Sequence, residues 1–141
     1  MAPFDSTVVN LAIPSIGKEL GGSIESLSWI ITSYLIIVAS LTLIAGRVAD
    51  IRGRKNTYVI GIAVFVTASA LCSFAPSVPI LIATRIVQAI GASMLYGNGV
   101  ALLSTFFGPN ERGRAIGILS ASTYTGLSLG SSVGGFLIQY L

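Results

Sequence analysis

The stretch Gly46-Arg-Val-Ala-Asp50-Ile-Arg-Gly53-Arg54-Lys55 separates two long apolar segments of the chain. It places four cations, one acid and two glycines within ten residues, in a chain of which only 9% is charged. Charged side chains are costly inside a bilayer, so such a cluster belongs at a membrane surface. The excess of Arg and Lys identifies that surface as the cytoplasmic one.

The composition outside this stretch predicts an integral membrane protein. The chain is 53% hydrophobic and its mean hydropathy is +0.87, which leaves too little polar material to cover a soluble globule. The shortest of four uncharged segments would span about 31 Å as a helix, the thickness of the hydrocarbon core. We therefore expect an all-α membrane fold, with helices in the uncharged segments 26–46, 56–84, 86–110 and 115–141.

Turn residues divide the chain into about five transmembrane helices. The first is too short for a full span, and the last apolar segment has no loop after it, so both ends indicate a fragment. The second helix is expected to start at a Ser26 or Ser28 cap. Proline and glycine end the third and fourth helices. The expected ranges are 4–17, incomplete, then 26–47, 57–75, 80–106 and 115–139.

The cations predict the orientation. Six Arg and Lys residues fall in the second-to-third and fourth-to-fifth loops, against one in the other two loops. The positive-inside rule therefore makes those two loops cytoplasmic and points to a multi-pass protein of the plasma membrane. The six are Arg47, Arg52, Arg54, Lys55, Arg112 and Arg114.

Several functional classes do not fit this sequence. The chain has no His, and its single Cys72 lies in an apolar run, so we expect no metal site and no disulfide. The cations lie beside the spans, where topology explains them, and this removes the argument for nucleic acid as a partner. No nucleophile with a base and no catalytic acid pair is present, so we expect a non-enzyme without a cofactor.

Five motifs in order resemble the N-terminal part of a major facilitator superfamily transporter, and they are most similar to its fourteen-helix drug/proton antiporters. Asp5-Ser-Thr7-Val-Val-Asn10-Leu-Ala12-Ile-Pro14 and Trp29-Ile-Ile-Thr-Ser-Tyr34-Leu35 resemble the signatures of the first two helices. The stretch 46–55 resembles the loop motif G-x-L-A-D-x-x-G-R-K, with Val48 in the Leu place.

The later helices carry the other two motifs. Arg85-Ile-Val-Gln88-Ala89-Ile-Gly91-Ala92 is similar to R-x-x-Q-G-x-G-A, with Ala89 in place of the first Gly. The antiporter motif is matched except that Ser131 replaces its proline, which weakens the assignment of transport direction. Its glycines are Gly117, Gly126, Gly130, Gly134 and Gly135.

The resemblance implies a partial N-terminal bundle over residues 1–141 and proton-coupled efflux of amphipathic drug-like compounds by alternating access. The partners would be a small-molecule substrate, protons, membrane lipid and the remainder of the transporter, with the proton gradient as driving force. Two alternatives stay open. One is a transporter of a specific metabolite with the same fold, and the other is a non-transporting truncated product or small membrane subunit.

The polar residues inside the spans are the candidates for proton coupling and the substrate pathway. Asp5 is the only acid within an expected span, and an acid whose exposure and partner change between states can carry protons. The alternative is that Asp5 only forms a structural pair or lies near the cytoplasmic face. The resemblance adds Asn10. Arg85 shares a helix face with Gln88 and Ala92, which favours a cavity, whereas snorkelling to the outer surface is the alternative.

The other motifs suggest gating and packing. Asp50 stands among cations at a helix end, and Gly53 permits a tight turn, so Asp50 can pair with Arg54 or with a neighbouring helix. The resemblance implies a cytoplasmic gating motif of Gly46, Asp50, Gly53, Arg54 and Lys55. The glycines at 126, 130 and 134 recur every four residues and are expected to form one face for close helix packing.

Overall fold

The computed structural model describes residues 2–20 and 23–140. Within these ranges, the side chains of residues 2–6, 10, 18–20, 24, 134 and 137–140 lie outside the description. The described residues form five helices and confirm the all-α membrane fold. The helices are α1 (Ala2–Leu20), α2 (Ile24–Arg52), α3 (Arg54–Ser73), α4 (Val78–Phe106) and α5 (Pro109–Tyr140).

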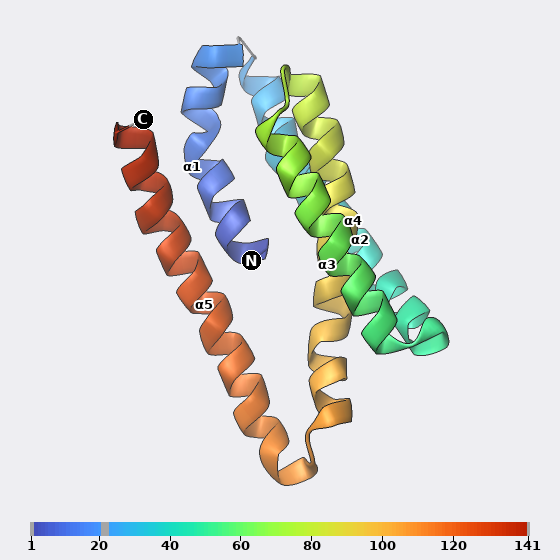
Figure 1. Cartoon of the computed structure of the whole chain (residues 1–141). Helices are drawn as coiled ribbons and strands as arrows, with labels where there is room; N and C mark the ends of the chain where they lie inside the picture. The colour runs from blue at the N-terminus through green and yellow to red at the C-terminus, as the bar shows by residue number, and fades with distance from the viewer. Residues whose placement is uncertain (1, 21–22, 141) are drawn as a thin grey trace.

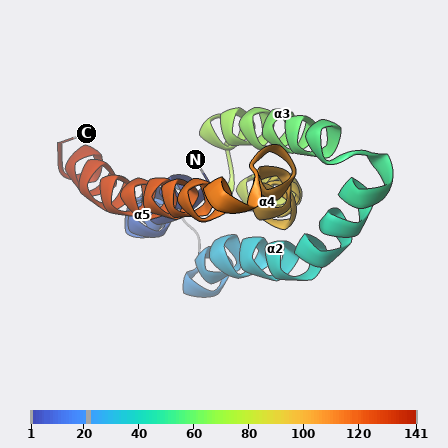
Figure 2. The ribbon, with the colours of Figure 1, turned by 90° about the horizontal axis from the view of Figure 1, so that it is seen from below.

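The helices form two packing groups (Figure 1). In the first, α4 lies between α2 and α3, as the view along the bundle in Figure 2 shows. In the second, α1 runs beside α5. The α2–α3 and α4–α5 junctions lie toward one end of the molecule, and the α3–α4 junction lies at the opposite end (Figure 1). The two cationic loops therefore share one end.

The helices differ from the expected ranges at most of their ends: α3 starts earlier, at Arg54, and ends earlier, at Ser73, while α4 ends at Phe106 as expected. Charged residues extend the helices beyond the apolar runs: Arg52 lies in the last turn of α2, and Glu111 in the first turn of α5. The cap expected at Ser26 or Ser28 is wrong: Ser23 is the N-cap of α2, and its Oγ accepts a hydrogen bond of 3.2 Å from the Ser26 N–H. Pro79 lies in the first turn of α4, where a missing N–H costs nothing.

Three helices in the described part of the chain are long and apolar enough to cross a membrane: Glu25–Arg52, Arg54–Ser73 and Val78–Phe106. They are the members of the α2–α4–α3 group. The fifth helix is longer, at 32 residues, but the serines and glycines of its second half lower its hydropathy.

Glycine allows the backbone of α4 to approach both neighbours. A Cβ on Gly91 would lie 2.6 Å from the Phe65 amide nitrogen and 2.9 Å from the Gly61 carbonyl oxygen of α3. A Cβ on Gly97 of α4 would meet the Thr42 carbonyl oxygen of α2 and lie 3.1 Å from the Gly46 nitrogen of the same helix. These contacts leave no room for a side chain, so α2, α4 and α3 pack as one layer through their backbones.

Candidate functional site

The candidate gating motif, residues 46–55, includes the turn between α2 and α3. Gly53 joins the two helices with a φ of 95°, a conformation that L side chains rarely adopt. The turn places Arg54 one helical turn after Asp50, and the Arg54 Nη2 lies 3.0 Å from the Asp50 Oδ1. The Arg54 Nε donates a second bond of 3.0 Å to the same oxygen. The expected pairing of these two residues is confirmed.

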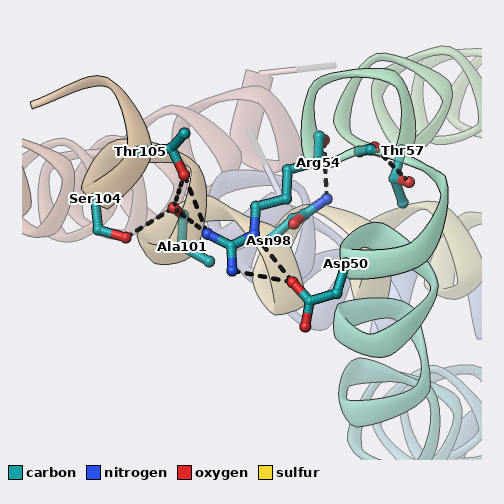
Figure 3. A network of polar contacts seen from close by, with 8 residues as sticks. Asp50, Arg54, Thr57, Asn98, Ala101, Ser104 and Thr105 are labelled. Carbon is teal, nitrogen blue, oxygen red and sulfur yellow. Dashed lines mark hydrogen bonds and ion pairs between the residues drawn. The ribbon is translucent and has the colours of Figure 1, made fainter.

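Helix α4 binds both the side chain and the backbone carbonyl of Arg54 (Figure 3). The Arg54 Nη1 donates to the Ala101 carbonyl oxygen at 3.0 Å and to the Thr105 Oγ1 at 3.1 Å. The Asn98 Nδ2 donates to the Arg54 carbonyl oxygen at 3.0 Å, and Asn98 is only 1% exposed. Since Asp50 belongs to α2, one arginine connects three helices.

Sequence reasoning missed Asn98 and Thr105. A signal was available for Asn98, because an amide between two glycines in an apolar helix is costly unless it is bonded. Lys55 and Gly46, the other two residues of the motif, have different surroundings. Lys55 is exposed, while Gly46 packs against α4, where an added Cβ would lie 3.4 Å from the Gly97 carbonyl oxygen.

A second polar cluster lies inside the α2–α4–α3 group. Arg85 is 2% exposed, and its Nη1 donates to the Gln88 Oε1 at 2.8 Å. The Gln88 Nε2 donates in turn to the Ser69 Oγ of α3 at 3.1 Å. The Arg85 guanidinium carbon lies 5.5 Å from the centroid of the Tyr34 ring of α2, within cation–π range.

The burial of Arg85 argues against the snorkelling interpretation. A snorkelling arginine would expose its head group, whereas this one is buried on the face that also carries Ala92, itself fully buried. The cluster keeps a guanidinium inside the apolar layer by giving it a hydrogen-bond acceptor and an aromatic face.

The remaining candidate residues lie on α1 and α5. Asp5 and Asn10 belong to α1, but their side chains lie outside the description, as do the surroundings of Gly134 on α5. On α5, Gly130 is buried and Gly126 half-buried. Gly117 and Gly135 have open space where a Cβ would be, so their packing role stays a prediction.

The fold and the two polar clusters define a multi-pass helical membrane protein with a buried cation and a charged junction at one end. Comparison with known sequences then assigns the family. The Major Facilitator Superfamily model matches residues 1–141, and the chain belongs to that family. The resemblance inferred from the five motifs is thereby confirmed.

Relatives of the chain include export and resistance proteins. It is 41% identical over 138 residues to the puromycin resistance protein pur8 of Streptomyces alboniger, covering 97% of this chain and 27% of that protein. It is 38% identical over 140 residues to the cephamycin export protein CmcT of Amycolatopsis lactamdurans, covering 98% and 29%. It is 33% identical over 140 residues to the riboflavin transporter RibZ of Clostridioides difficile (strain 630), covering 99% and 31%. The chain thus spans less than a third of the length of these three relatives.

Proposed function

We propose that this chain forms part of a proton-coupled transporter that exports amphipathic drug-like compounds by alternating access. The observation that carries this proposal is the buried Arg85–Gln88 pair, bonded to α3 and facing the Tyr34 ring of α2. A cation inside a membrane span is costly and is characteristic of ion or substrate pathways. Family membership and the names of the resistance and export relatives support the same function.

In the proposed cycle, Asp5 binds and releases the proton, and Arg85 responds to the charge of Asp5. Asn10 and Gln88 supply neutral hydrogen bonds along the same pathway. Movement of protons down their gradient would drive the substrate outward, so the mechanism uses no cofactor and breaks no covalent bond. The remainder of the transporter would form the other wall of the substrate site.

The same proposal places the two cationic loops in the cytoplasm and the protein in the plasma membrane. The positive-inside rule supports this orientation, since six cations lie at one end of the bundle. In this orientation the Asp50–Arg54 ion pair belongs to the cytoplasmic side of the pathway. We assign to it the closed state of a cytoplasmic gate, with Gly53 as the turn on which α2 and α3 meet.

The experiment uses the complete protein reconstituted in liposomes. A substrate gradient should move protons and change the internal pH, and both Asp5→Asn and Arg85→Ala should abolish this change. Arg47→Ala is a matched control, because it removes an exposed cation from the cytoplasmic loop and should leave the flux intact. Unaltered proton movement in both pathway variants would contradict the coupling assignment.

Transport of one specific metabolite is the second candidate function, and the riboflavin transporter among the relatives favours it. The two functions differ in substrate range. Structurally unrelated amphipathic compounds should each drive proton movement in an exporter of drugs, whereas a metabolite transporter should respond to one chemical family.

A truncated product or a small membrane subunit remains the non-transporting alternative. Immunoblotting of the source membrane with an antibody to the second-to-third loop tests it. A protein near 14.6 kDa would support that alternative, and one several times larger would support the transporter.

A further inference from the structure

The C-terminal end of α4 receives an arginine from each cationic loop. Arg54 of α3 donates to the Ala101 carbonyl oxygen at 3.0 Å, and Arg112 of α5 donates through its Nη2 to the Ser104 carbonyl oxygen at 3.0 Å. The last turn of α4 contains no basic residue of its own. Two neighbouring helices therefore supply the positive charge that the negative end of the α4 dipole favours.

The Ala101 carbonyl oxygen accepts hydrogen bonds from several side chains at once. Besides Arg54, it accepts from the Ser104 Oγ at 2.8 Å and the Thr105 Oγ1 at 3.0 Å (Figure 3). Thr105 also accepts from Arg54, so its hydroxyl bridges the guanidinium and the carbonyl. On α4, the Ala101 carbonyl oxygen and the Thr105 hydroxyl therefore hold the cation without an acidic side chain, and the Ser104 hydroxyl does not contact it.

Asn98 fixes the other end of Arg54. Its buried amide binds the Arg54 carbonyl oxygen, so the backbone and the guanidinium of one residue are held by the same face of α4, at positions 98, 101 and 105. The spacing of three and four residues is what a helix needs to present these groups together. Arg54 is therefore oriented mainly by α4.

We propose that the C-terminal end of α4 is the common anchor of the two cationic loops, with Asn98 and Thr105 as positioning residues for Arg54 and the Ser104 carbonyl as the anchor for Arg112. This inference rests on the proposed transport function, because it assigns to α4 one half of the cytoplasmic gate. Release of the arginines from α4 would widen the groove that Arg54 lines. That groove has a volume of about 500 Å³, and its lining includes Ala49, Arg54 and Thr105.

The test measures opening by chemical accessibility and needs no substrate. Ala49 is 0% exposed, so we place a cysteine there in the complete protein, replace Cys72 by Ser and remove any other cysteine. A membrane-impermeant maleimide is then applied to the loop-bearing side in inside-out vesicles. Thr105→Val, which cannot accept from Arg54, should raise the labelling rate by about 3- to 10-fold, as expected for loss of one ordinary hydrogen bond that is exposed to solvent.

Conservative variants separate positioning from general structure. Thr105→Ser keeps the hydroxyl and should label at the parental rate. Ser104→Ala removes the neighbouring hydroxyl but not the carbonyl, and it should also label at the parental rate. Asn98→Leu should raise the rate further, since it removes the buried anchor of the Arg54 backbone. Equal labelling of Thr105→Val and Thr105→Ser would overturn the positioning role.

The second anchor has its own matched pair. Arg112→Gln should raise labelling of the cysteine at position 49, whereas Arg114→Gln removes an equal charge from the same loop and should not. Equal rates for these two variants would overturn the role of Arg112. If labelling follows the prediction while no compound drives proton movement, the anchor stands and the transport proposal fails.

Discussion

Replacement of Gly91 by Ala tests whether α4 is packed against α3 through backbone. The new Cβ would lie 2.6 Å from the Phe65 nitrogen, 2.9 Å from the Gly61 oxygen and 3.0 Å from the Phe65 Cα. All three are backbone atoms, so no rotamer change can relieve the clash, and α3 has to move by about 1 Å to reach ordinary contact distance. Overpacking costs about 1 to 3 kcal/mol, and a backbone clash belongs at the upper end of that range.

Helix propensity acts in the opposite direction and sets the net effect. Ala is favoured over Gly in a helix by about 1 kcal/mol, so Gly91→Ala should lower the free energy of unfolding by about 2 kcal/mol. The measurement is equilibrium unfolding of the purified protein in mixed detergent micelles. Gly99→Ala is the control on the same helix, because its Cβ would meet only the Leu119 Cδ2 at 3.9 Å. Equal stability of the two variants would refute the close packing of α4 on α3.

Three further predictions concern the polar sites. Gln88→Leu removes the acceptor of Arg85 and should cost about 1.5 to 3 kcal/mol in unfolding free energy, whereas Gln88→Glu keeps an acceptor and should cost less. Gly53→Ala should lower the free energy of unfolding by about 1 to 3 kcal/mol through the positive φ of Gly53 alone, because no atom lies within 4 Å of the added Cβ. Gly113→Ala is the control, since Gly113 is equally open but helical, and it should not lower the stability. Equal losses of stability in the two variants would contradict an origin in the positive φ. Asp50→Asn should change unfolding by less than about 1 kcal/mol, because the ion pair is solvent-exposed, while increasing cytoplasmic labelling at position 49; a large stability loss would show a structural role instead.

Much of the site was predictable because its chemistry is local in sequence. Asp50 and Arg54 are four residues apart across a glycine, and Arg85 and Gln88 are three residues apart on one helix, so helical spacing alone brings each pair together. The contacts between different helices were not predictable, although the position of Asn98 in an apolar helix indicated that its amide must be bonded. Ser69 and Asn98 are ordinary polar residues in apolar runs until the packing of α3 against α4 gives them their acceptors and donors.

The sequence by itself determined the membrane class, the helical fold and the clustering of cations at one end. These properties follow from hydropathy and charge, which act residue by residue wherever the chain meets lipid or water. Only the tertiary structure decided that α4 lies between α2 and α3, that Arg85 is buried rather than snorkelling, and that both cationic loops bind one helix end. The physical reason is that lipid is as apolar as the helices, so helix pairing depends on close backbone contacts and on hydrogen bonds between distant residues.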